Sequence, residues 1–116
     1  FDIFTAEEVT LVKDKTYTIS TGIAMAIPEG YYGELKARSS IDAKTPLRIA
    51  TGTIDSSYRG EIKIIAELKR GDAYTIEKGA KIAQLILHKV PAVEIEVVDE
   101  LDETDRGAGG FGSTGK

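Results

Sequence analysis

Short apolar runs separated by turn residues are the feature that most limits the fold of this chain. The clearest runs are at 31–37, 61–68 and 81–89, where residues such as Leu, Ile and Tyr recur. Glycine, proline and acidic residues stand between them, as in Pro28-Glu29-Gly30, and such punctuation is typical of chains built from many short strands. No stretch keeps the spacing of an amphipathic helix, so any helix should be short or absent. The sequence therefore predicts an all-β fold, namely a sandwich, a jelly roll or a small barrel.

Further strands are expected where shorter runs of the same kind occur. The run at 9–13 is separated from the run at 16–19 by charged residues, as in a hairpin. The other expected strands are 23–27, 47–51, 74–76 and 93–98.

Composition restricts the class of protein. The 116 residues predict one domain, and 41% hydrophobic residues suffice for a core. The absence of cysteine excludes disulfides and thiolate metal sites. No apolar run approaches the roughly 20 residues that span a bilayer, and there is no signal-peptide pattern. The net charge of −4 argues against a nucleic-acid partner. We expect a cytoplasmic enzyme or binding module that has no membrane partner.

The segment 52–62, Gly-Thr-Ile-Asp-Ser-Ser-Tyr-Arg-Gly-Glu-Ile, carries the strongest chemical signal. Gly52 and Gly60 are expected to bracket a tight β-hairpin, because glycine supplies the positive φ that such turns often need. Asp55 and Tyr58 would then lie near its tip. There a carboxylate can accept a proton from water, and an aromatic ring can pack against a flat substrate. Alternatively, Asp55 only caps its own turn, and the motif alone leaves both interpretations open.

The glycine-rich end at 106–116 is the second signal, and a boundary is predicted between residues 105 and 106. Its glycine amides can wrap a phosphate chain, Arg106 can pair with phosphate charge, and Phe111 can stack on a base. The composition is also that of a simple disordered end. Neither a Walker nor a Rossmann phosphate loop is present.

Two weaker signals come from strands. Arg38-Ser39-Ser40 follows the run at 31–37 and offers a planar cation and hydroxyl donors to a phosphate chain. Gln84 interrupts an otherwise apolar strand, where its amide could face a substrate or be satisfied by solvent or a neighbouring strand.

Together these residues resemble the homotrimeric dUTPase (dUTP diphosphatase) family. The resemblance covers essentially the whole chain and places five motifs in the family's order, at 1–3, 37–40, 52–62, 81–84 and 106–115. It implies a distorted jelly-roll-like subunit, 1–105, in a homotrimer. It also implies an arm, 106–116, that closes over a neighbouring subunit's active site. The implied reaction converts dUTP to dUMP and pyrophosphate, which limits uracil incorporation into DNA and supplies dUMP for dTTP synthesis.

The resemblance also implies roles for single residues. Asp55 would orient and deprotonate the water that attacks the α-phosphorus. Tyr58 would pack on the deoxyribose and leave no room for a 2′-hydroxyl. On the subunit body, the residues implied to bind the phosphates are Arg38, Ser39, Ser40 and Gln84. In the arm, Arg106 would pair with the γ-phosphate and Phe111 would stack on uracil, while further substrate contacts are implied for Gly112, Ser113 and Thr114.

The chain departs from the family pattern at two places. The first motif begins at its aromatic residue, Phe1, and the implied Mg²⁺ would be held through water by Asp2, near that end. Many members carry asparagine six residues before the catalytic aspartate, where this chain has Ile49. Uracil would then be read by main-chain groups around Ile49, Gly52, Ile54 and Tyr58. Lys63 would support the sugar or the water.

Two other functions remain as alternatives. A dCTP deaminase has a related fold, but it needs an acid near the base, and the acids near the motif are Glu61 and Glu67. A regulatory protein that uses the nucleotide as a signal is the second alternative. Product analysis separates the first from a dUTPase, and partner capture with and without nucleotide separates the second.

Overall fold

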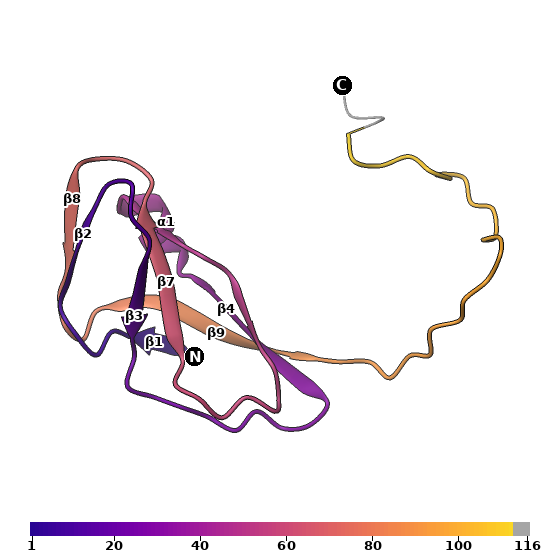
Figure 1. Ribbon diagram of the computed structural model, residues 1–116, viewed down its shortest axis with the longest axis horizontal. Coiled ribbons are helices and arrows are strands. Elements are labelled where there is room, and N and C mark those ends of the chain that lie inside the picture. The colour runs from indigo at the N-terminus through magenta and orange to yellow at the C-terminus, as the bar shows by residue number, and fades with distance from the viewer. Residues whose placement is uncertain (113–116) are drawn as a thin grey trace.

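The computed structural model describes residues 1–112 and shows a β body from which a long C-terminal segment departs (Figure 1). The described residues contain nine strands and one short helix. In chain order these are β1 (Asp2–Phe4), β2 (Val9–Val12), β3 (Tyr17–Ser20), β4 (Tyr31–Ala37), α1 (Ser39–Lys44), β5 (Leu47–Ile49), β6 (Gly52–Ile54), β7 (Lys63–Leu68), β8 (Ala73–Ile76) and β9 (Lys81–Lys89). The predicted all-β class is confirmed.

The strands pair in a nested order. β1 pairs with β9, β2 with β8, β3 with β7 and β4 with β6, all antiparallel, while β5 joins β7 and β4 also joins β9. The result is three sheets with the orders β1-β9-β4-β6, β2-β8 and β3-β7-β5. This nesting is that of one long hairpin rolled up around its middle, which is a jelly-roll-like topology.

Alternating residues of these strands build one core. In β4 only Gly33 and Leu35 are buried, and in β7 Ile64 and Ala66 are buried. Residues from all three sheets meet in a single cluster, since strands that alternate apolar and polar residues bury one face. The opposite faces remain available for polar side chains, and the functional residues lie there and in the loops.

Both predicted hairpins are wrong. β2 and β3 pair with β8 and β7 rather than with each other. β6 lies in the sheet of β4, whereas β7 lies in the sheet of β3 and β5, so the 52–62 segment is a turn between two sheets. Turn residues bring two runs close together, but in a jelly roll the hydrogen-bonding partners come from distant parts of the chain.

The predicted strand at 23–27 is also wrong, and so is the one at 93–98, where the described segment forms no strand. Its alternating Val93, Ile95 and Val97 are exposed by 76%, 91% and 95%. Alternation favours an extended backbone, but a strand also needs a partner for its backbone groups. Just before this segment, the Val90 N–H still donates to the Gly30 carbonyl, at 2.8 Å.

The expectation of little helix is confirmed, since α1 covers only six residues, and it begins at Ser39 directly after β4. No helix in the described part of the chain is long and apolar enough to cross a bilayer.

Candidate active site

The first cluster of site residues lies where β1, β4 and β9 run side by side. Asp2 lies opposite Gln84, and Gln84 lies opposite Lys36. The Asp2 carboxylate lies 3.4 Å from Arg38 Nε and 3.8 Å from Lys81 Nζ. The tertiary structure thus joins three motifs that are far apart in the sequence.

This cluster suits an anionic ligand. One carboxylate, Asp2, faces two cations, Arg38 and Lys81, so the group carries a net positive charge. The pairs are partly exposed, and ion pairs of this kind are weak. A phosphate chain can therefore compete with Asp2 for the arginine, whose planar fork matches phosphate oxygens.

The neighbours of Arg38 have less defined contacts. Ser39 and Ser40 are the first residues of α1, and no side chain caps that helix. The Gln84 Nε2 donates a hydrogen bond to the Ala37 carbonyl at 3.1 Å. This amide is thus partly satisfied by the neighbouring strand, one of the two interpretations that the sequence left open.

The second cluster surrounds the turn at 55–58. The Tyr58 N–H donates to the Asp55 carbonyl at 3.0 Å and closes the turn, leaving the Asp55 side chain exposed. A surface pocket of about 220 Å³ opens beside it, lined by Thr53, Ile54, Asp55, Tyr58, Glu61 and Lys63. Four predicted site residues, Ile54, Asp55, Tyr58 and Lys63, therefore share one pocket.

The Tyr58 ring is held in a defined place. Its Oη donates to the Glu61 carbonyl at 2.7 Å. The ring also covers Gly60, where an added Cβ would lie 2.5 Å from Tyr58 Oη. Neither Gly52 nor Gly60 has a positive φ, so the predicted reason for these glycines is wrong. Gly60 instead leaves room for the tyrosine.

Glu61 is a site residue whose role the sequence did not reveal. Its Oε2 accepts hydrogen bonds from Ser20 Oγ and from the Gly22 N–H, the latter at 2.9 Å. The Ser20 hydroxyl and then the Gly22 amide lower the pKa of the Glu61 carboxyl, because both favour its charged form. The available signal was its position directly after Gly60.

The two clusters lie at opposite ends of β4. Ile54 lies opposite Gly33, so Asp55 is beside the Tyr32 end of that strand. Arg38 follows the other end, six positions along the chain from Tyr32. At about 3.3 Å per residue, the separation is roughly 20 Å. A single chain therefore does not bring Asp55 and Arg38 to the same phosphate group.

Ile49 lies apart from both clusters. It belongs to β5, its side chain is buried in the core, and it does not line the pocket beside Asp55. Gly52 begins β6 opposite Leu35. The structure thus places Ile54 and Tyr58 at the pocket, whereas Ile49 is not part of its lining.

The described part of the arm lies apart from the β body (Figure 1). The Arg106 Nε donates to the Gly109 carbonyl, and the Gly109 N–H donates to the Arg106 carbonyl at 3.1 Å. Phe111 is fully exposed, and Gly112 is also exposed. Ser113 and Thr114 lie outside the described residues. The structure thus brings no described arm residue to either cluster.

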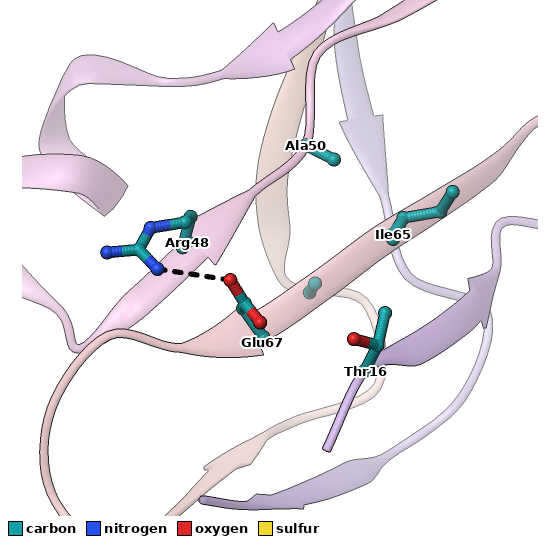
Figure 2. A pocket seen from close by; sticks show the side chains of 6 residues that line it. Thr16, Arg48, Ala50, Ile65 and Glu67 are labelled. Atoms are coloured by element: carbon teal, nitrogen blue, oxygen red, sulfur yellow. Dashed lines mark hydrogen bonds and ion pairs between the residues drawn. The ribbon is translucent and has the colours of Figure 1, made fainter. Parts of the chain in front are cut away.

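A second pocket of about 220 Å³ lies on the sheet β3-β7-β5 and is shown in Figure 2. Its charged side chains, Arg48 and Glu67, pair with each other at 3.0 Å, and Ile65 and Ala50 contribute apolar surface. Because the two charges neutralise each other, this pocket is a poorer candidate for phosphate chemistry than the pocket beside Asp55.

The donor groups of residues 1–112 determine how a metal ion could bind to this part of the chain. These residues contain no group of three or more His, Cys, Asp or Glu side chains that could hold an ion. Asp2 is a single carboxylate beside Arg38 and Lys81. Mg²⁺ commonly binds through one or two carboxylates while waters and phosphates supply the other ligands. The residues therefore fit a Mg²⁺ that arrives with a phosphate chain, and they do not form a site made by protein alone.

This chain is similar to known proteins over nearly its whole length. The sequence model of the dUTPase family matches residues 1–115. A deoxyuridine 5′-triphosphate nucleotidohydrolase of Paramecium bursaria Chlorella virus 1 is 43% identical, over 99% of this chain and 82% of the relative. The solved dUTPase of Staphylococcus bacteriophage 80alpha with dUPNHPP has a TM-score of 0.91 at 34% identity, over 99% of this chain and 85% of that one.

A third relative bears on the metal. It is a mutant dUTPase of phage phi11 of S. aureus, solved to show how a structural Mg(II) ion is coordinated. It has a TM-score of 0.80 at 33% identity, over 85% of this chain and 82% of that one.

Proposed function

The chain belongs to the dUTPase family, which makes it a hydrolase of dUTP, and we propose that it releases dUMP and pyrophosphate by in-line attack of water on the α-phosphorus. The observation that carries this proposal is the turn at 55–58. It presents an exposed carboxylate, Asp55, beside a fixed aromatic ring, Tyr58, and a cation, Lys63, in one pocket. A base, a sugar-binding surface and a positive charge are the parts that this hydrolysis needs.

Asp55 would act as the general base. It is exposed at the pocket, so water can reach it. A carboxylate there can orient the water and accept its proton as the oxygen attacks phosphorus. Tyr58 would pack on the deoxyribose, and its position would leave no room for a 2′-hydroxyl.

The phosphates would bind at the other cluster. Arg38 would pair with phosphate oxygens, Ser39 and Ser40 would donate hydroxyl hydrogen bonds, and Gln84 would offer its amide. Asp2 would hold, through water, the Mg²⁺ that arrives with the triphosphate. Bound there, Mg²⁺ would neutralise phosphate charge and fix the phosphate chain. Arg38 spreads the negative charge that grows in the transition state.

A complete site would then need more than one copy of the chain. Asp55 and Arg38 of one chain lie roughly 20 Å apart along β4, too far to act on one phosphate group. We therefore propose a homotrimer in which each site takes its base and its phosphate-binding groups from different subunits. The exposed apolar side chains of Val93, Ile95 and Val97 support assembly, because clustered apolar side chains in contact with water commonly mark an interface.

The arm would close such a site. Arg106 would pair with the γ-phosphate, Phe111 would stack on uracil, and Gly112, Ser113 and Thr114 would contact the substrate. The full exposure of Phe111 supports this role, since the ring has not buried its surface in its own subunit.

Product analysis tests the proposed function. The purified protein is incubated with Mg²⁺ and, in separate reactions, dUTP, dCTP, dTTP or UTP. We expect pyrophosphate and dUMP from dUTP and far slower release from the other three nucleotides. Ammonia release from dCTP would instead support a deaminase, and no turnover of dUTP would refute the proposal.

Mixed assemblies test the sharing of sites. An Asp55→Asn chain and a chain that lacks residues 106–116 should each be nearly inactive alone. Mixed trimers should regain part of the activity if base and arm come from different subunits. Verified mixed trimers without any rescue would show that each chain completes its own site.

A further inference from the structure

The Glu61 side chain connects two segments that are distant in the sequence. One carboxylate oxygen, Oε2, accepts from Ser20 Oγ and from the Gly22 N–H at 2.9 Å. Ser20 ends β3, and Glu61 lies just before β7, the strand that pairs with β3. The anchor therefore sets the position of residue 61 relative to the sheet, from outside the turn that carries Asp55.

The peptide unit between Glu61 and Ile62 connects this anchor to Tyr58. The Glu61 carbonyl accepts from Tyr58 Oη at 2.7 Å, and the N–H of the same peptide unit, that of Ile62, donates to the Ile23 carbonyl at 2.8 Å. Because the peptide unit is planar and rigid, its two hydrogen bonds turn together. The segment 20–23 and the tyrosine hydroxyl are thus the two ends of one short rigid link.

The position of the Tyr58 ring in the pocket depends on this link. Gly60 supports the ring from one side, where an added Cβ would lie 2.7 Å from Tyr58 Cζ. Tyr58 also lines the pocket beside Asp55, and it is 43% exposed. Together with the glycine contact, the hydrogen bond to the Glu61 carbonyl restrains the end of this side chain. Loosening the Glu61 carbonyl would therefore let the ring move within the pocket.

We infer that Glu61 is a positioning residue: through its bonds to Ser20 and Gly22 it fixes the carbonyl that holds Tyr58, and so sets the enzyme's discrimination between deoxyribose and ribose. This inference rests on the proposed function, in which Tyr58 packs against the sugar. It adds to that function a specificity determinant that acts through the position of Tyr58.

Glu61 is a poor candidate for the base itself, although it lines the same pocket. Its Oε2 is occupied by two donors, and the same donors lower the pKa of the carboxyl. A carboxylate of lowered pKa is a weaker proton acceptor than one of ordinary pKa. Asp55 remains the exposed acid of the turn.

The test compares selectivity, measured as kcat/KM for dUTP divided by kcat/KM for UTP, in four variants of the full chain. Glu61→Ala removes the anchor, and Ser20→Ala removes one of its donors. Glu61→Gln keeps an oxygen that accepts both hydrogen bonds without the charge. Glu67→Ala is the matched control, because it removes a half-buried acid of β7 that pairs with Arg48 and does not line the pocket beside Asp55.

We expect Glu61→Ala to lower the selectivity ratio by about tenfold, part of the roughly 10²-fold by which a snug pocket rejects an added hydroxyl. Ser20→Ala should lower it in the same direction by less, whereas Glu61→Gln and Glu67→Ala should keep it. A general loss of folded protein would reduce both activities alike and leave the ratio unchanged. If Glu61→Ala does not fold, Ser20→Ala decides the matter.

An unchanged ratio in folded Glu61→Ala would overturn the inference, as would an equal loss in Glu61→Gln. A second measurement separates its failure from failure of the proposed function. In NMR spectra of protein with isotope-labelled tyrosine, the Tyr58 ring signal should shift in Glu61→Ala but not in Glu67→Ala. That result stands even if the wild-type protein does not hydrolyse dUTP, and an unmoved signal would refute the link.

Discussion

Gly60→Ala should damage catalysis while leaving the fold nearly as stable as before. The new methyl group would lie 2.5 Å from Tyr58 Oη and 2.7 Å from Cζ. Ordinary carbon contacts are about 3.5–4.0 Å, so the ring must retreat by about 1 Å. A misplacement of that size near a reaction can cost about 10²-fold in rate. We therefore expect kcat/KM for dUTP to fall by up to about 10²-fold.

The stability terms nearly cancel. Residue 60 does not have a positive φ, so alanine is allowed there. A tolerated glycine-to-alanine change stabilises by about 0.4–1 kcal/mol through the unfolded chain. Loss of the bond from Tyr58 to the Glu61 carbonyl costs about 0.5–1.5 kcal/mol. The free energy of unfolding should thus change by no more than about 1 kcal/mol.

The assay combines steady-state kinetics with denaturant unfolding, and Ser57→Ala serves as the control from the same turn. The decisive comparison introduces Gly60→Ala into a Tyr58→Ala background. There the methyl group meets no ring, so it should cost little further activity. An equal loss in both backgrounds would refute the reasoning, as would unchanged kinetics in the single variant.

Four further predictions concern the proposed base, the arm, the exposed apolar segment and Glu61. Asp55→Asn should keep nucleotide affinity but lower kcat by about 10²-fold or more. Binding and turnover assays with dUTP check this, and normal turnover would exclude Asp55 as the base. Deleting residues 106–116 should lower dUTP turnover more than dUMP binding, since dUMP lacks the phosphates that the arm would contact, and equal losses would argue against the arm as a lid. Ile95→Asp, which puts a charge on a 91% exposed apolar side chain, should shift the protein from trimer to monomer by light scattering, with Glu94→Asp as a control that should stay trimeric. The pKa of the Glu61 carboxyl is lowered from 4.5 in the folded chain, so the stabilisation by the charged carboxylate should be complete above pH 4.5 and be lost as the pH falls through the folded pKa. The difference in unfolding free energy between wild type and Glu61→Gln should therefore shrink on acidification. A difference that stays constant would contradict the role of Glu61 as a charged hydrogen-bond acceptor.

Local patterns in the sequence were enough to locate most strands. β4 and β9 begin and end where the apolar runs do, at Tyr31–Ala37 and Lys81–Lys89. Alternation and turn residues act within a few positions of the chain, and they persist whatever the distant partners are. The turn that presents Asp55 and Tyr58 could also be predicted, because its residues are adjacent in sequence.

The pairing of those strands required the tertiary structure. Both local hairpins were wrong because each strand bonds to a distant partner, as β2 does to β8. The run at 93–98 has the alternation of a strand but has no partner within the described chain, which no local pattern reveals.

The difference between local patterns and long-range pairing also applies to the site. The sequence indicated Asp2, Arg38 and Gln84 one motif at a time, but only the register of β1, β9 and β4 shows that they meet. The anchor from Glu61 to Ser20 joins residues 41 positions apart. The chemistry of a single side chain can be read from the sequence, whereas the distance between two side chains depends on long-range packing. For this reason the residues of the turn could be predicted, and the contacts that hold Tyr58 in place could not.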